Sequence, residues 1–158
     1  YNIICFTIAF ALIPIARKLG AKRLHFISLA IGGSALLCMP LLNDTDLLFT
    51  LPFGSGIDVS QIYLFSFGLG ITWASMMAMP YEMLAASIPH GKTGIYMGIF
   101  NMFIVVPMII QIFSVQYFIY DLLDQNPINI IRLAGIFLII GGIFSLFVSQ
   151  PKPNETLV

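Results

Sequence analysis

The chain has little charge: only 9% of its 158 residues are charged, and seven basic residues balance seven acidic ones. Nucleic-acid binding requires a basic surface, which a chain with zero net charge and so few cations does not offer. A water-soluble domain is excluded as well, because 59% of the residues are hydrophobic and the mean hydropathy is strongly positive. This composition is typical of a protein embedded in a lipid bilayer.

Cysteine is scarce, and the sequence lacks the clusters that carry catalysis. Cys5 and Cys38 both lie in apolar runs, where a free thiol behaves as a small hydrophobic side chain. No group of His, Cys, Asp and Glu has the spacing of metal ligands, and the sequence contains neither a nucleophile elbow nor a phosphate-binding loop. We therefore expect no catalytic residue, no metal and no cofactor, and we do not expect an enzyme.

Long apolar runs are what the sequence does contain. A helix that rises about 1.5 Å per residue needs about 20 residues to cross a hydrocarbon core about 30 Å thick. Runs such as GIFLIIGGIFSLFV lack the alternating polarity of barrel strands, so helices are expected. The sequence predicts an all-α, polytopic membrane helix bundle over residues 1–150, followed by a cytoplasmic tail over residues 151–158. The five predicted spans are residues 2–16, 24–42, 61–88, 94–120 and 130–149.

The distribution of Lys and Arg predicts how these spans are oriented. Four basic residues crowd the first connection, whereas the second connection carries three Asp and no basic residue. By the positive-inside rule, the first and third connections and the C-terminus face the cytoplasm. We therefore expect a multi-pass protein of the cell membrane that begins outside and ends inside. An odd number of spans with an external start suits the back end of a longer carrier.

Two stretches resemble parts of a known transporter family. PIARKLGAKR, residues 14–23, resembles the short basic turn that joins adjacent helices in the major facilitator superfamily. GITWASMMAMPYEMLAASIPHGKTGIYMGIFNMFIVVP, residues 70–107, is similar to two adjacent spans of the glycoside-pentoside-hexuronide group, especially of its sucrose-transporter-like branch. The similar features are a Pro near the cytoplasmic end of one span, a short Gly-containing loop, the pattern G-x-x-M-G-x-x-N and a mid-span Pro.

The resemblance implies a fold and an activity. The five spans would form most of the C-terminal half of a twelve-helix major facilitator fold, whose two halves rock to give alternating access. The implied activity is secondary active transport of a sugar, a disaccharide or glycoside such as sucrose or maltose, by symport with a proton or with sodium. The implied partners are the sugar, the coupling ion, the lipid bilayer and the N-terminal half of the carrier, which would hold the proton-binding acid. Two alternatives stay open: a transport-like membrane sensor or scaffold, and an exporter on the same fold.

Three side chains within the predicted spans are candidates for sugar binding. Trp73 lies mid-span, and its aromatic ring offers a surface for the C–H face of a sugar, although lipid contact or packing is the alternative. Asn101 and Gln111 are amides in apolar helix, where they need partners such as substrate hydroxyls or polar groups of a neighbouring helix. Ten residues apart, these two amides are predicted to share one side of their helix.

Glu82 is the single carboxylate in residues 77–103. About twenty residues into its span, it is predicted to lie near the cytoplasmic interface, on the same side of the membrane as the basic first connection. We expect it to form an ion pair with Arg17 or Arg23 that acts as a cytoplasmic latch, and direct proton carriage is the alternative. His90, in the loop IPHGKTG, is expected to be a solvated side chain.

Pairs of small residues four positions apart predict close contact between helix backbones. The pairs in this sequence are Ser28 with Gly32, Gly94 with Gly98, and Gly141 with Ser145. We expect all three pairs to lie at helix–helix interfaces.

Overall fold

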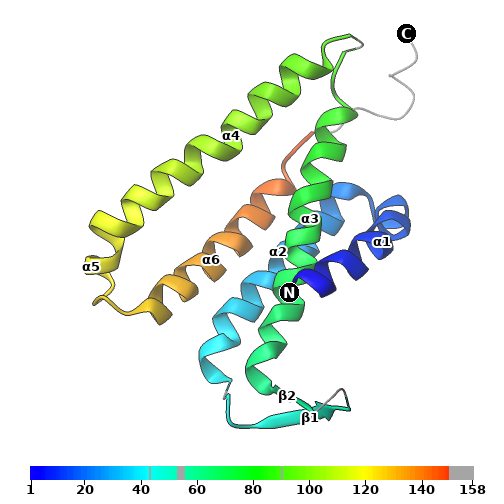
Figure 1. The fold of residues 1–158 in the computed structure, drawn as a ribbon. Coiled ribbons are helices and arrows are strands. Elements are labelled where there is room, and N and C mark those ends of the chain that lie inside the picture. The colour runs from blue at the N-terminus through cyan, green and yellow to red at the C-terminus, as the bar shows by residue number, and fades with distance from the viewer. Residues whose placement is uncertain (43, 53–55, 90, 150–158) are drawn as a thin grey trace.

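Within the residues that the structure describes, the fold consists of five long helical segments and one small β-hairpin (Figure 1). The computed structural model describes residues 1–42, 44–52, 56–89 and 91–149, so the predicted tail lies outside the described residues. All five segments are long and apolar enough to cross a membrane, which confirms the prediction of a membrane helix bundle. The segments are α1 (Asn2–Leu19); α2 (Ala21–Cys38) with η1 (Met39–Leu41); η2 (Gln61–Leu64) with α3 (Phe65–Ala85); α4 (Thr93–Ser114) with η3 (Val115–Ile119) and α5 (Tyr120–Leu122); and α6 (Pro127–Ser145).

The turn between α1 and α2 is shorter than predicted, because Gly20 alone separates the two helices. Gly20 has a φ of 82°, a left-handed conformation that glycine adopts without strain. The basic residues expected in a connecting turn therefore lie on the helix ends. Arg17 and Lys18 occupy the last turn of α1, where positive charge interacts favourably with the helix dipole and long side chains reach water.

The last span is shifted toward the N-terminus relative to its prediction, and it begins at Pro127 and ends at Ser145. Asn126 caps this helix, because its side-chain oxygen accepts a hydrogen bond from the Ile128 N–H at 3.0 Å. Proline at the first helical position needs no hydrogen-bond partner for its nitrogen, so the helix starts there at little cost.

The second connection contains an antiparallel hairpin that the sequence reading did not predict. β1 (Leu47–Leu51) pairs with β2 (Ile57–Ser60). Thr50 lies opposite Asp58, and its hydroxyl donates to the Asp58 carboxylate at 2.7 Å. Strands of four or five residues give too few alternations for a period of two to be recognised in the sequence.

α2 is the centre of the packed part of the fold, since it packs against both α3 and α6. A Cβ atom built on Gly33 would lie 2.6 Å from the carbonyl oxygen of Gly135 in α6, so only glycine allows this approach. On the α3 side, Gly32 lies directly against Thr72, which confirms the predicted contact for the pair of Ser28 and Gly32. Seven buried apolar residues join α1, α2 and α3: Leu12, Ala16, Ala21, Leu24, Ala74, Met79 and Met83.

α4 lies beside the packed helices rather than among them (Figure 1). No residue of α4 is buried, although its segment is the most apolar of the five. A Cβ atom on Gly94, Gly98 or Gly141 would meet nothing within 4 Å, so the packing predicted at these three glycines is wrong. Small residues permit close approach, but a close contact also requires a second helix at that face. Ser145, the partner of Gly141 in its pair, is buried as expected.

Candidate binding site between the spans

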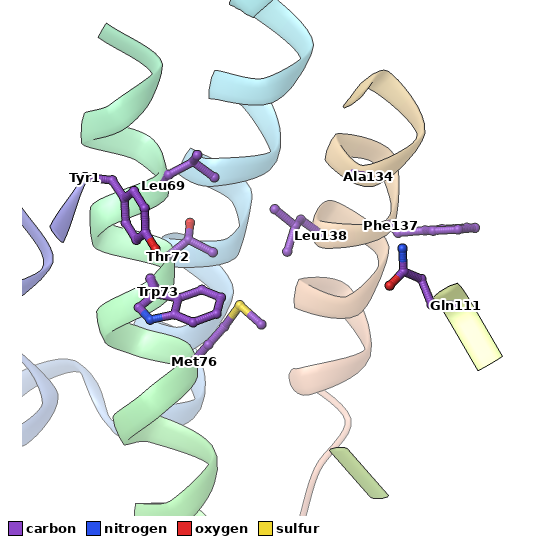
Figure 2. A pocket seen from close by; sticks show the side chains of 9 residues that line it. All are labelled: Tyr1, Leu69, Thr72, Trp73, Met76, Gln111, Ala134, Phe137 and Leu138. Carbon is purple, nitrogen blue, oxygen red and sulfur yellow. The ribbon is translucent and has the colours of Figure 1, made fainter. Parts of the chain in front are cut away.

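A pocket of about 650 Å³, which we call the central pocket, lies between α3, α4 and α6 (Figure 2). It is at mid-span, because Trp73 lies about halfway along the segment that contains α3, and Phe137 lies about halfway along α6. Most of its lining is apolar, and among the described residues Gln111 is the only amide that lines it. The lining residues are Leu69, Thr72, Trp73 and Met76 of α3, Ala134, Phe137 and Leu138 of α6, Gln111 of α4, and Tyr1.

The central pocket brings together two of the three side chains predicted to bind sugar. Trp73 and Gln111 lie on opposite sides of it in Figure 2 and come from different helices. The Trp73 ring meets the Tyr1 ring edge-on, with the centroids 6.3 Å apart, yet the residue remains 46% exposed. Packing against Tyr1 therefore leaves much of the Trp73 surface free for a ligand.

Asn101, the third predicted residue, does not line the central pocket. Its side-chain oxygen accepts a hydrogen bond from the Tyr81 hydroxyl at 2.6 Å, which joins α4 to α3. The Tyr81 ring also meets the Phe100 ring edge-on, at a centroid distance of 5.0 Å. The structure thus gives Asn101 the interhelical bond that was the alternative to sugar contact. The sequence reading did not select Tyr81, although a tyrosine and an amide flanking the same short connection are a usable signal for such a bond.

The three residues of the predicted latch lie at one end of the packed helices but are not joined. Glu82 precedes Met83, which packs in the same apolar cluster as Ala16 at the end of α1. The side chains of Glu82, Arg17 and Arg23 are all exposed, and within the described parts of the chain no ion pair links Glu82 to either arginine. The latch stays a prediction, which would require a different arrangement of these side chains.

Two further hollows continue from the central pocket toward the end of the bundle that carries Glu82. The first has a volume of about 290 Å³ and the second about 360 Å³. Neighbouring hollows share lining residues, so the three lie next to one another between α3, α4 and α6, and α2 contributes to the two smaller ones. We call this row of hollows the interspan groove. The shared residues are Met76, Phe137 and Leu138 for the first junction, and His25, Pro80 and Phe100 for the second.

His25 of α2 lines this groove, and the sequence reading did not select it. The signal was available, because an ionisable residue inside a predicted span is by default a candidate functional residue. His90, which is predicted to be a solvated side chain, lies outside the described residues.

We compared the chain with models of protein families, with curated proteins and with solved structures, and none of them matches. The similarity of residues 70–107 to sugar carriers is therefore an expectation drawn from the sequence. The function has to be argued from the geometry of the central pocket and the helices around it.

Proposed function

We propose that the chain is part of a secondary carrier of the major facilitator type that transports a sugar by alternating access. The observation that carries the proposal is that Trp73 and Gln111 line the same mid-span pocket. Carriers hold their substrates near the bilayer midplane, where access can be opened to one side or the other. Five segments able to cross a membrane supply the required setting.

The chemistry of the pocket favours a sugar over a purely apolar or a charged ligand. A pyranose has an apolar C–H face and hydroxyls at its edge, so it suits an aromatic ring opposite an amide that can both donate and accept. The volume of about 650 Å³ falls within the range of about 300–1,000 Å³ that is usual for small-molecule sites. A charged solute would require an opposite charge, and among the described residues no side chain that lines the central pocket is charged at neutral pH.

The orientation we propose places the C-terminus and the connection between α3 and α4 in the cytoplasm. Arg17, Lys18 and Lys22 support it, because they gather at one end of the packed helices, where Lys22 donates to the Val148 carbonyl oxygen at 3.2 Å. The β-hairpin at the opposite end carries Asp58 and would face the outside.

A substitution pair on α4 tests the sugar site. Gln111→Ala removes the amide of the central pocket, and leaving a substrate hydroxyl unpaired costs on the order of 1–3 kcal/mol, or about tenfold to a hundredfold in affinity. Gln116→Ala is the matched control, since Gln116 is an exposed amide on the same helical segment that does not line the pocket. The measurement is calorimetric binding of sucrose and maltose to the purified protein, with thermal unfolding recorded for each variant.

Trp73 provides a second measure in the same assay. Trp73→Phe keeps an aromatic face and should weaken sugar binding less than Trp73→Ala does. A stable Gln111→Ala variant that binds as tightly as the parent would place the sugar elsewhere. A parent protein that binds neither sugar would contradict the assignment of a sucrose-like or maltose-like substrate.

A further inference from the structure

A cluster of buried polar side chains joins α2 and α3 close to the interspan groove. His25 is 7% exposed, Ser28 1% and Ser75 0%. The His25 Nδ1 atom lies 2.9 Å from the Ser75 hydroxyl oxygen, and Thr72 donates to the Ser28 carbonyl oxygen at 2.7 Å. The Ser28 hydroxyl, one helical turn from His25, is enclosed and has no hydrogen-bond partner among the described residues. Of these hydroxyls, the one of Ser75 is in direct hydrogen-bond contact with the imidazole.

The second imidazole nitrogen of His25 is free to meet a ligand. Nε2 has no hydrogen-bond partner in the described parts of the chain, and it is not among the enclosed polar atoms without a partner. His25 lines both smaller hollows of the interspan groove. Nδ1 is therefore held against Ser75, while Nε2 is not fully enclosed and belongs to a side chain that lines the groove.

Among the residues that the structure describes, no other titratable side chain lines these two hollows. The nearest titratable groups along each element are Lys22 and Arg23 on α2, and Tyr81 and Glu82 on α3. The α4 and α1 helices contribute Lys92 and Tyr96 at the start of α4, and Arg17 and Lys18 at the end of α1. On α6 the described helix carries Arg132 alone, near its opposite end. A proton taken from the groove would therefore be held by His25.

We propose that His25 and Ser75 form a proton-binding site of this protein. In the neutral tautomer that can take up a proton, the Nδ1–H group donates to the Ser75 hydroxyl oxygen, and Nε2 has an unprotonated lone pair. When a hydronium ion in the groove gives its proton to the free imidazole nitrogen, one N–H bond forms, one O–H bond breaks and a water molecule is released. Both ring nitrogens are then donors, and the Ser75 hydroxyl oxygen continues to accept the hydrogen bond from Nδ1–H.

The location of His25 couples this proton to the opening of the groove. A charged imidazole in hydrocarbon is costly, so protonation favours whichever state lets water reach the groove. α4 covers the groove with no buried residue and is bonded to α3 by Tyr81 and Asn101, so it is the element whose displacement would admit water. This coupling step rests on the proposed transport function, whereas proton binding at His25 does not.

Histidine NMR of the purified protein tests the site directly. The chain has two histidines, and His90→Gln leaves the signal of His25 alone. We expect the His25 imidazole resonances to move reversibly as the pH is lowered from about 8 to about 4, because histidine changes charge nearest neutrality and burial disfavours its charged form. Ser75→Ala should shift the midpoint by about 0.5–1 pH unit, since it removes one hydrogen bond to the ring. If the His25 ring keeps one protonation state across this range, the proposal is wrong. This test requires no substitution at His25.

Transport in vesicles separates this inference from the proposed function. His25→Gln should abolish uphill sugar accumulation driven by a pH gradient but retain sugar exchange at equal pH, and His90→Gln should leave both unchanged. Uphill accumulation by a folded His25→Gln variant would overturn the coupling of the His25 proton to transport without contradicting the carrier function. A titrating His25 in a protein that moves no tested sugar would support the proton site and contradict the function.

Discussion

The α2 and α4 helices are both apolar enough to cross a membrane, yet only α2 is packed within the chain. Seven residues of α2 are buried, five of which are small or polar: Ala21, His25, Ser28, Gly32 and Gly33. α4 has no buried residue, although its segment is the more apolar of the two. In a membrane, lipid is as apolar as a leucine side chain, so apolar character alone does not hold helices together. Close approach and interhelical hydrogen bonds do, and α2 has both.

This difference divides the molecule into a packed unit and an attached helix. α1, α2, α3 and α6 form the packed unit, which carries Trp73 and His25, whereas α4 carries Gln111 and Asn101. The central pocket and the interspan groove lie between the two regions. A site at a boundary between a fixed and a loosely held region can change shape without disrupting the core, which is what alternating access requires.

The largest expected effect tests whether both regions cross the same membrane. In a background with Cys5 and Cys38 replaced by Ala, we expect an impermeant thiol reagent added outside intact cells to label Leu48→Cys and Leu122→Cys fully. Thr93→Cys, at the other end of α4, should remain unlabelled until the membrane is permeabilised. Equal labelling at Leu122 and Thr93 would mean that α4 does not span, and full protection of Leu48 would reverse the orientation.

Matched glycine substitutions measure the difference in packing. Gly33→Ala should destabilise the protein by about 1–3 kcal/mol, because the added carbon would meet the Gly135 carbonyl oxygen and the Ile139 side chain. Gly98→Ala on α4 meets open space and should be neutral or stabilising by up to about 1 kcal/mol through helix propensity. Unfolding of the two purified variants is compared with that of the parent. Equal losses at both positions would show that α4 is packed as tightly as α2.

The sequence predicted the apolar segments well because membrane thickness requires long runs of apolar residues, and such runs are visible residue by residue. The sequence did not predict as well which helices pack against one another. The motif of Gly94 and Gly98 has the same spacing as that of Ser28 and Gly32, but only the second pair has a helix against it. Which face of a helix meets another helix depends on the arrangement of all the spans.

The candidate site shows the same limit. Trp73 and Gln111 could be selected as an aromatic ring and an amide in apolar helix, and the fold places both in one pocket. Helical spacing also suggested that Asn101 would join Gln111, but ten residues correspond to about 15 Å along the axis, so one helix face can serve two different neighbours. Asn101 meets Tyr81 instead.

A smaller effect is expected from the bond that attaches α4 to α3. Tyr81→Phe removes the hydroxyl that donates to Asn101 but keeps the ring against Phe100, so the free energy of unfolding should fall by no more than about 0.5–1.5 kcal/mol. A Cys at Ile104, which lines the groove on α4, should nevertheless react faster with a small thiol reagent in this variant. Tyr63→Phe, at the far end of the α3 segment, is the control. Unchanged reactivity at Ile104 would show that the hydrogen bond does not hold α4 in place.

The smallest effect is expected at Glu82. Its side chain is exposed and forms no ion pair with Arg17 or Arg23 among the described residues, so Glu82→Gln should change stability by less than about 0.5 kcal/mol. If the protein is the proposed carrier and the predicted latch forms in another of its conformations, the variant will shift the balance between inward-open and outward-open states, measured by the distance between spin labels across the groove.

Charge exchange identifies the partner of Glu82, because residues that interact show coupling in a double-mutant cycle and independent residues do not. Glu82→Arg combined with Arg17→Glu, or with Arg23→Glu, should restore the parent distribution for the true partner only. In the control, Glu82→Arg is combined with Lys92→Glu instead, because Lys92 is not part of the predicted latch. If the effect of the Glu82 substitution simply adds to that of either arginine substitution, the prediction of a latch is wrong. Selective loss of proton-driven uptake in Glu82→Gln would then assign proton carriage to Glu82, and equal uptake by His25→Gln would exclude His25 from that role.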